Sequence, residues 1–409
     1  MLYGIAAATT ALLLAALLAA LLRVPALRLG LVERRQRQRR VPLSGGLAVV
    51  VTTCLVAVAG DRWGIAPLGG DIGVLLVAGG AVAGLGLVAD VWRLRARFLV
   101  LGTAVAAAFV VPYGDTGAVA GTVAVGWITC VALAFRSLDH ADGVAGTVGV
   151  VTAFGAAACA AVEVMDGFAV LLSVLAAALT GFLMHNWPPA RVALGACGSL
   201  FAGFLLAAAA VTVRAGQDAA EGVGVLFALT AVAVADAVLV AVARRLAGRP
   251  LPRGGPDHLA HRLRRLGLTP QGATVAIGVA AFCGVLVGTL AHTGWMGAQA
   301  VWWVAGGVLA VVLALLRVSV YGPPRARGGG YGPPRARGGA RADSRYGAPG
   351  ARAGRRDPRS GPRPGARPAP VYGPRRQSES DVRAPDSGDR RAGGGESSQV
   401  SDFLRVRNG

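Results

Sequence analysis

The chain carries two aspartates three residues apart, Asp139 and Asp142, in a short polar segment between two apolar runs. On a helical turn this spacing places both carboxylates on one side of the helix. Such a pair could hold a divalent cation through its oxygen atoms, or act as base and anchor in proton transfer. The competing interpretation is a capped helix start, because aspartate is also favoured at the first turn of a helix.

Two further polar segments interrupt apolar runs. Asn186 opens a proline-rich loop that leads into residues 195–199, Gly-Ala-Cys-Gly-Ser. Glycines there would let backbone N–H groups approach an anion, although they are also ordinary loop residues. His258 and His261, followed by Arg262, form a basic patch suited to phosphate oxygens. Without cysteine or a close acidic third ligand, the two histidines do not predict a zinc site.

Three weaker candidates follow from isolated polar positions. Residues 42–46, Pro-Leu-Ser-Gly-Gly, come after an arginine-rich stretch and could receive phosphates, whereas topology determination is the simpler explanation of those arginines. Asp90 precedes three arginines, so an ion pair with one of them is favoured over a ligand role. Asp236, in an apolar run, is either functional or the partner of Arg244 or Arg245.

Composition indicates that membrane helices position these groups. The chain has 409 residues, 54% of them hydrophobic and only 15% charged, which is too little polar cover for a soluble domain. Eleven segments reach spanning length, near residues 3–22, 44–60, 72–89, 98–113, 117–135, 144–163, 167–185, 198–213, 222–242, 272–292 and 296–318. We therefore predict an all-α polytopic membrane protein with 10 or 11 transmembrane helices.

Arginine placement predicts the orientation, because the sequence contains no lysine. Alternate loops hold 19 arginines, whereas the other loops hold two, Arg62 and Arg214. The positive-inside rule then places the N-terminus outside and the C-terminus in the cytoplasm. All the polar motifs fall on the cytoplasmic face, which predicts a single anion-binding surface there. A cleaved signal peptide is disfavoured, because no basic region precedes the first apolar segment.

The composition changes after residue 318. Residues 319–409 are rich in Gly, Pro, Arg and Ser, and the sequence Tyr-Gly-Pro-Pro-Arg-Ala-Arg-Gly-Gly occurs twice. We predict a transmembrane domain over residues 1–318 and a disordered cytoplasmic tail after it. The tail's arginines favour contact with anionic lipid over nucleic-acid binding. The five cysteines show no CxxC spacing and are interpreted as small packing residues.

The order of the loops resembles that of the polyprenyl-phosphate N-acetylhexosamine-1-phosphate transferases, glycosyltransferase family 4. This family includes the phospho-MurNAc-pentapeptide translocase and the undecaprenyl-phosphate GlcNAc-1-phosphate transferases. Residues 138–143 resemble its aspartate-rich loop, Asn-x-x-Asp-Gly-x-Asp-Gly, and residues 186–199 its Asn-x-x-Pro-Ala loop running into Gly-Asp-x-Gly-Ser. Residues 258–263 resemble its His-x-His-His motif, and residues 42–46 its Pro-x-x-Gly-Gly. Residues 88–90 fall where the family has Asp-Asp.

The resemblance implies transfer of a sugar 1-phosphate from a UDP-sugar to polyprenyl phosphate, with release of UMP and with Mg²⁺ at the site. The implied partners are the lipid phosphate and a UDP-N-acetylhexosamine, at the plasma membrane, and we also expect a homodimer. The implied catalytic and metal-binding residues are Asp90, Asp139 and Asp142. The implied substrate-binding residues are Pro42, Gly45, Gly46, Arg136, Asn186, Gly195, Gly198, Ser199, His258, His261 and Arg262.

The chain departs from the family pattern at four positions. Ala89 and Ala196 replace aspartates, Arg136 replaces the first asparagine of the aspartate-rich loop, and Ala260 replaces a histidine. The net change toward positive charge disfavours a dication, which usually needs one or two carboxylates. Two hypotheses follow: an active transferase, or a catalytically silent member that binds polyprenyl phosphate or nucleotide sugar or scaffolds an envelope-assembly complex. A transporter would predict mid-span polar pairs or an internal repeat, and the sequence shows neither.

Overall fold

The computed structural model describes residues 2–34, 40–64, 69–92, 94–249, 257–297 and 299–318. The predicted tail, residues 319–409, lies outside them. The long helices are α1 (Leu2–Leu21), α3 (Gly45–Arg62), α4 (Gly69–Trp92), α5 (Ala96–Val110), α6 (Tyr113–Leu138), α7 (Val144–Val162), α8 (Asp166–Asn186), α9 (Gly195–Val213), α10 (Ala219–Leu246), α12 (Pro270–His292) and α13 (Ala300–Leu316).

These helices coincide with the eleven predicted apolar segments. In the described part of the chain, nine helices are long and apolar enough to cross a membrane, and α5 and α13 are shorter apolar helices. The prediction of an all-α polytopic membrane protein is confirmed. All five cysteines lie within the helices as free thiols.

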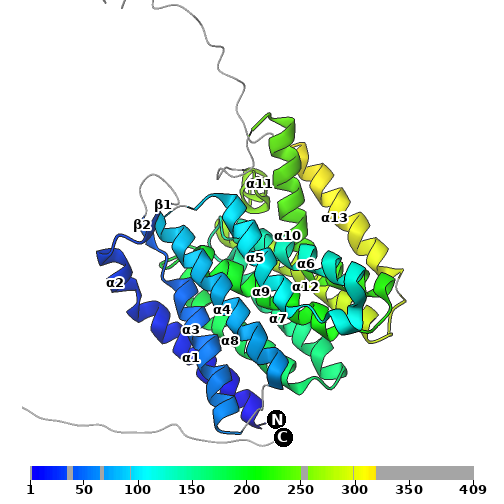
Figure 1. The fold of residues 1–409 in the computed structure, drawn as a ribbon. Helices are drawn as coiled ribbons and strands as arrows, with labels where there is room; N and C mark the ends of the chain where they lie inside the picture. The colour runs from blue at the N-terminus through cyan, green and yellow to red at the C-terminus, as the bar shows by residue number, and fades with distance from the viewer. Residues whose placement is uncertain are drawn as a thin grey trace, which may run out of the picture. The chain divides into compact units, whose positions relative to one another are not determined.

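Helix α9 forms the centre of the bundle. It packs against α3, α4, α6 and α7, and nearly all of its residues are buried. Its own phenylalanines, Phe201 and Phe204, are fully buried, as are Phe135 of α6 and Phe182 of α8. Helices α10, α12 and α13 pack together, and α10 and α13 run side by side in Figure 1. Small residues throughout the spans allow this close packing.

Three short elements lie between the spans. Helix α2 (Arg23–Arg28) leads into a hairpin of β1 (Val32–Arg34) and β2 (Arg40–Pro42), and α11 (Leu259–Arg265) precedes α12. The strands are antiparallel, with Val32 opposite Pro42 and Glu33 opposite Val41. The hairpin is a departure from the all-helical prediction, and the β-branched valines at its paired positions favour extended backbone. It carries Glu33 to the candidate site described below.

Candidate functional site

The site is built around the N-terminus of α9. The backbone N–H of Gly195 donates to Asp139 Oδ2 (2.8 Å), that of Ala196 donates to Asp90 Oδ1 (3.0 Å) and that of Cys197 donates to Asp90 Oδ2 (3.1 Å). The first N–H groups of a helix have no partner within the helix, and negative charge is favourable at that end. Asp90 and Asp139 therefore cap α9 from two neighbouring helices.

Two expectations change as a result. The prediction that Asp90 pairs with the arginines that follow it is wrong, because both of its oxygens accept backbone hydrogen bonds from α9. The N–H groups of this loop do meet an anion, as predicted, but the anions are the protein's own carboxylates. Gly195 has a φ of +70°, and a Cβ there would lie 2.7 Å from Asp90 Oδ2, so the cap requires glycine at this position.

The aspartate-rich loop is tied to the Asn-Pro loop. Asn186, which is 1% exposed, accepts from Gly143 N (2.8 Å) and donates to Val192 O (2.7 Å), and Ala190 N donates to Asp142 Oδ2 (3.1 Å). The helical turn expected to align Asp139 with Asp142 is absent, because α6 ends at Leu138 and residues 139–143 form turns. The two carboxylates instead bind different backbone groups.

The Pro-x-x-Gly-Gly segment brings α3 against α9. Ala193 N donates to Pro42 O (2.9 Å), and Gly45 N donates to Ala193 O (3.0 Å). Gly46 and Gly198 lie in backbone contact, so a Cβ on either would overlap the other residue. These glycines have a packing function here, and their contact with substrate stays a prediction. Ser199 is also buried and donates its hydroxyl to Gly195 O (2.6 Å).

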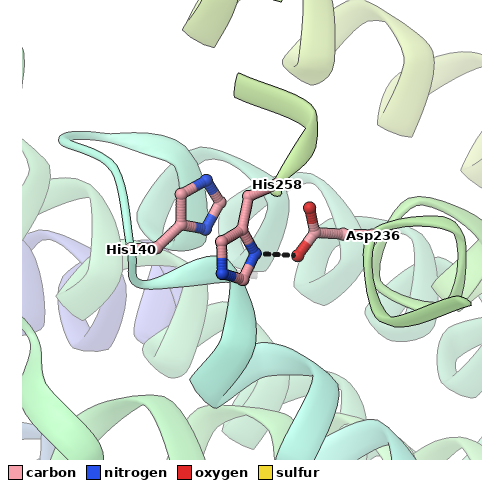
Figure 2. A group of neighbouring side chains, drawn as sticks. All are labelled: His140, Asp236 and His258. Atoms are coloured by element: carbon pink, nitrogen blue, oxygen red, sulfur yellow. Dashed lines mark hydrogen bonds and ion pairs between the residues drawn. The ribbon is translucent and has the colours of Figure 1, made fainter. Parts of the chain in front are cut away.

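A second polar cluster surrounds Asp236 of α10. Its Oδ2 accepts from His258 Nδ1 (2.9 Å) and from the Ser137 hydroxyl (3.3 Å), and its Oδ1 accepts from Leu259 N (2.8 Å). Figure 2 shows the His258 ring between the His140 ring and the Asp236 carboxylate. The two rings are stacked, with centroids 3.8 Å apart and planes 14° apart. The predicted pairing of Asp236 with an arginine is therefore wrong.

The arginines near this cluster have other partners. Arg244 pairs with Asp257 (3.0 Å), and both side chains are buried. Arg262, also buried, donates to the carbonyl oxygens of Asp257, Leu315 and Val318, so it fastens α11 to the end of α13. This geometry gives Arg262 a structural function. Arg262 is not among the residues that line the cavity described below, and its contact with substrate phosphate stays a prediction.

His261 lies beside the histidine stack. Its ring centroid is 5.1 Å from that of His140. Burial, His258 and the nearby arginines lower the pKa of His261 below its ordinary value. Burial, together with His258, lowers the pKa of His140 to about 3, so this imidazole is neutral at physiological pH.

The segments meet around a cavity of about 400 Å³. Five predicted site residues line it: Asp90, Arg136, Asp139, Gly195 and His258. The sequence interpretation did not single out Glu33, Ser137, His140 or Arg244, which line it as well. One signal in the sequence could have identified His140 as a site residue: it lies between Asp139 and Asp142, which were both candidates. The cavity thus combines carboxylates, guanidinium groups and imidazoles, a set that can bind phosphate oxygens and a cation.

Comparisons with known proteins indicate the family of this chain. Residues 72–214, which contain the caps of α9, match the family model for glycosyl transferase family 4. A Streptomyces coelicolor protein named only provisionally as a glycosyltransferase is 66% identical over 356 residues, covering 86% of this chain and 84% of that protein. The chain belongs to glycosyltransferase family 4.

More distant members of the family carry more specific names. The decaprenyl-phosphate N-acetylglucosaminephosphotransferase of Mycolicibacterium smegmatis is 29% identical over 302 residues, covering 62% of this chain and 74% of that protein. A probable undecaprenyl-phosphate N-acetylglucosaminyl 1-phosphate transferase of Bacillus subtilis is 24% identical over 274 residues, covering 62% and 75%. The chain is thus similar over much of its length to transferases that are named for polyprenyl phosphate and N-acetylglucosamine.

Proposed function

We propose that the chain transfers an N-acetylhexosamine 1-phosphate from a UDP-sugar to polyprenyl phosphate and releases UMP. The observation that carries this proposal is the cavity itself, at which the five motif segments, far apart in sequence, are brought together. In the reaction, an oxygen of the lipid phosphate forms a bond to the phosphorus attached to the sugar. The phosphoanhydride bond to the other phosphorus breaks, and its electron pair leaves with UMP.

The arginines of the cavity suit this reaction. Two polyanions must approach each other, and guanidinium groups bind phosphate oxygens through paired N–H donors. Arg136 is exposed in the last turn of α6, and Arg244 is held in place by Asp257. We propose that Arg136 binds the incoming phosphate and that Arg244 stabilises charge deeper in the cavity.

Magnesium is the cofactor that the family resemblance implies, and family members are generally metal-dependent. The carboxylates present do not fit a Mg²⁺ ion held mainly by aspartates. Both oxygens of Asp90 and one oxygen each of Asp139 and Asp142 accept backbone hydrogen bonds, and Ala196 presents a methyl group where the family has a carboxylate. We therefore assign no step of the reaction to magnesium.

Further parts of the proposal concern placement. We propose that the cavity opens on the cytoplasmic face of the plasma membrane, because nearly all loop arginines belong to the same set of alternate loops as the motif segments that form the cavity. We also propose that the transferase domain ends near residue 318, that the arginine-rich remainder contacts anionic lipid, and that the protein forms a homodimer.

One observation favours a second candidate, a catalytically silent member that binds polyprenyl phosphate or nucleotide sugar. The aspartates that would act in catalysis are engaged in capping α9. Such a protein would retain the basic cavity and bind a phosphate without turning it over. It could serve as a scaffold for envelope assembly.

A UMP-release assay distinguishes the two candidates. The purified full chain would be given polyprenyl phosphate with UDP-GlcNAc or UDP-MurNAc-pentapeptide, with and without Mg²⁺. We expect turnover that Arg136→Ala reduces strongly, whereas the matched control Arg191→Ala, an exposed arginine outside the cavity lining, leaves it unchanged. Absence of turnover, with lipid-phosphate binding that Arg136→Ala weakens, would support the silent member. Absence of both would reject both candidates.

A further inference from the structure

Asp236 is a fully buried carboxylate whose hydrogen-bond partners carry no permanent positive charge. Its side chain is 0% exposed, and its partners are the His258 ring, the Ser137 hydroxyl and the Leu259 backbone. Burying an ionised carboxylate is costly unless a positive charge offsets it. In the described part of the chain, Asp236 has no arginine partner, so a bound cation would offset its charge.

A hydrogen bond fixes the tautomer of His140, one of the two stacked histidines. His140 Nδ1 lies 2.8 Å from Ser137 O, and a carbonyl oxygen can only accept, so Nδ1 carries the proton. His140 Nε2 therefore presents a lone pair, and this buried atom has no hydrogen-bond partner among the described residues. His258 Nδ1 lies 2.9 Å from Asp236 Oδ2, a separation at which the two atoms share the Nδ1 proton or, once that proton is released, can ligate one ion together.

The three side chains are close enough to share one ion. One potential ligand atom from each of His140, Asp236 and His258 lies within 4.8 Å of the others. Ligand atoms around one zinc-sized ion lie roughly 3 to 4 Å apart, as follows from metal–nitrogen bonds of about 2.0 Å. The His140 ring would have to turn out of its stack on His258 when the ion binds, because the in-plane lone pairs of two stacked rings run parallel.

We propose that His140, Asp236 and His258 form a binding site for a divalent transition-metal ion such as Zn²⁺. Imidazole ligands favour borderline transition metals, whereas magnesium prefers oxygen ligands and retains its waters. The proposed ion supplies the positive charge that would offset the buried Asp236 carboxylate. It is a different site from the aspartates that cap α9.

The position of the site gives the ion a place in the proposed reaction. His140 and His258 also line the cavity, so an ion between them lies in its wall. There it could bind a phosphate oxygen of the substrate, which is a function that the capped carboxylates do not provide. This function depends on the proposed transferase activity, whereas metal binding itself does not.

Cobalt binding tests the site independently of turnover. The full chain, purified without a histidine tag and stripped of metal, would be titrated with Co²⁺, and visible absorption would be recorded. We expect one equivalent to bind with the absorption bands of a low-coordinate nitrogen- and oxygen-ligated site, and we expect Zn²⁺ but not excess Mg²⁺ to displace it. His140→Ala and His258→Ala are expected to weaken binding at least tenfold.

Two controls keep the test decisive. His185→Ala and His292→Ala remove histidines that contact other parts of the bundle, so they should leave Co²⁺ binding unchanged. A third variant at the site itself, Asp236→Asn, keeps the shape of the side chain but removes its charge, and we expect it to weaken Co²⁺ binding. If the wild-type chain binds no Co²⁺, or if its binding survives His258→Ala, the proposal fails. Metal binding without UMP release would reject the transferase and retain the metal site.

Discussion

The Asp90 carboxylate accepts the backbone N–H of Ala196, the residue that stands where the family motif carries an aspartate of its own. The cap of α9 thus lies next to the position at which the family resemblance implies an aspartate. The two features together explain why the site retains acidic residues and still does not fit magnesium.

Restoring the missing aspartate should restore magnesium binding. In the Ala196→Asp variant, a third carboxylate would lie beside Asp90 and Asp139, and their mutual repulsion would be relieved by a dication. We expect Mg²⁺ to bind this variant more tightly than the wild type by at least about tenfold, the lower range for metal-site changes. Thermal unfolding in detergent with increasing Mg²⁺ measures the difference.

The matched control for this variant is Ala215→Asp, which adds the same charge just beyond the opposite end of α9. It should show no response to Mg²⁺. Equal stabilisation of the wild type and Ala196→Asp by Mg²⁺ would contradict the prediction.

The contact between Gly46 and Gly198 should not tolerate a side chain. Gly198→Ala places a methyl group against the Gly46 backbone, and overpacking of this kind typically costs about 1–3 kcal/mol. We expect a lower unfolding temperature. Gly80→Ala is the control, because a Cβ at that helical position meets nothing within 4 Å, and it should be neutral or slightly stabilising. Similar unfolding temperatures for the two variants would disprove the close contact.

Arg262 should stabilise the end of α13. Arg262→Ala removes its hydrogen bonds to the Leu315 and Val318 carbonyls, and hydrogen bonds to a charged group are worth about 1.5–3 kcal/mol each. We expect lower thermal stability and faster tryptic cleavage after Arg317, measured by mass spectrometry. The exposed neighbour Arg264 is the control. If Arg264→Ala has as large an effect as Arg262→Ala, the fastening function is refuted.

Asn186 should hold the two central loops together. Asn186→Ala leaves Gly143 N and Val192 O without their partner, which should cost about 1–3 kcal/mol for each buried group. Asn186→Asp keeps the acceptor for Gly143 but places a buried carboxylate oxygen against the Val192 carbonyl, so a larger loss is expected. Unfolding temperatures of the two variants give the order, and the reverse order would contradict this role.

The sequence predicted the spans well because crossing a membrane is a local requirement. Each span must be apolar over its own length, and all eleven predicted segments appear as helices. The short elements were harder to predict. The β1–β2 hairpin and α11 are brief and polar, and their stability depends on neighbouring segments rather than on their own pattern.

The partners of the site residues could not be predicted from local pattern. Asp90 and Ala196 are 106 residues apart, so nothing near Asp90 indicates that it caps α9 rather than pairing with the arginines that follow it. The same holds for Asp236 and His258, which are 22 residues apart and belong to different elements. The resemblance to the family predicted that the loops form one site. The choice of hydrogen-bond partner for each residue, however, depends on the packed structure.

The enclosure of α9 by α3, α4, α6 and α7 has a consequence for how the family could diversify. A helix held on every side cannot tilt or slide, so the base of the cavity is rigid and the same for any ligand. For the proposed transferase, adaptation to another sugar or isoprenoid would therefore come from the peripheral pieces, the hairpin with Glu33 and the segment around α11, whose changes leave the helical scaffold undisturbed.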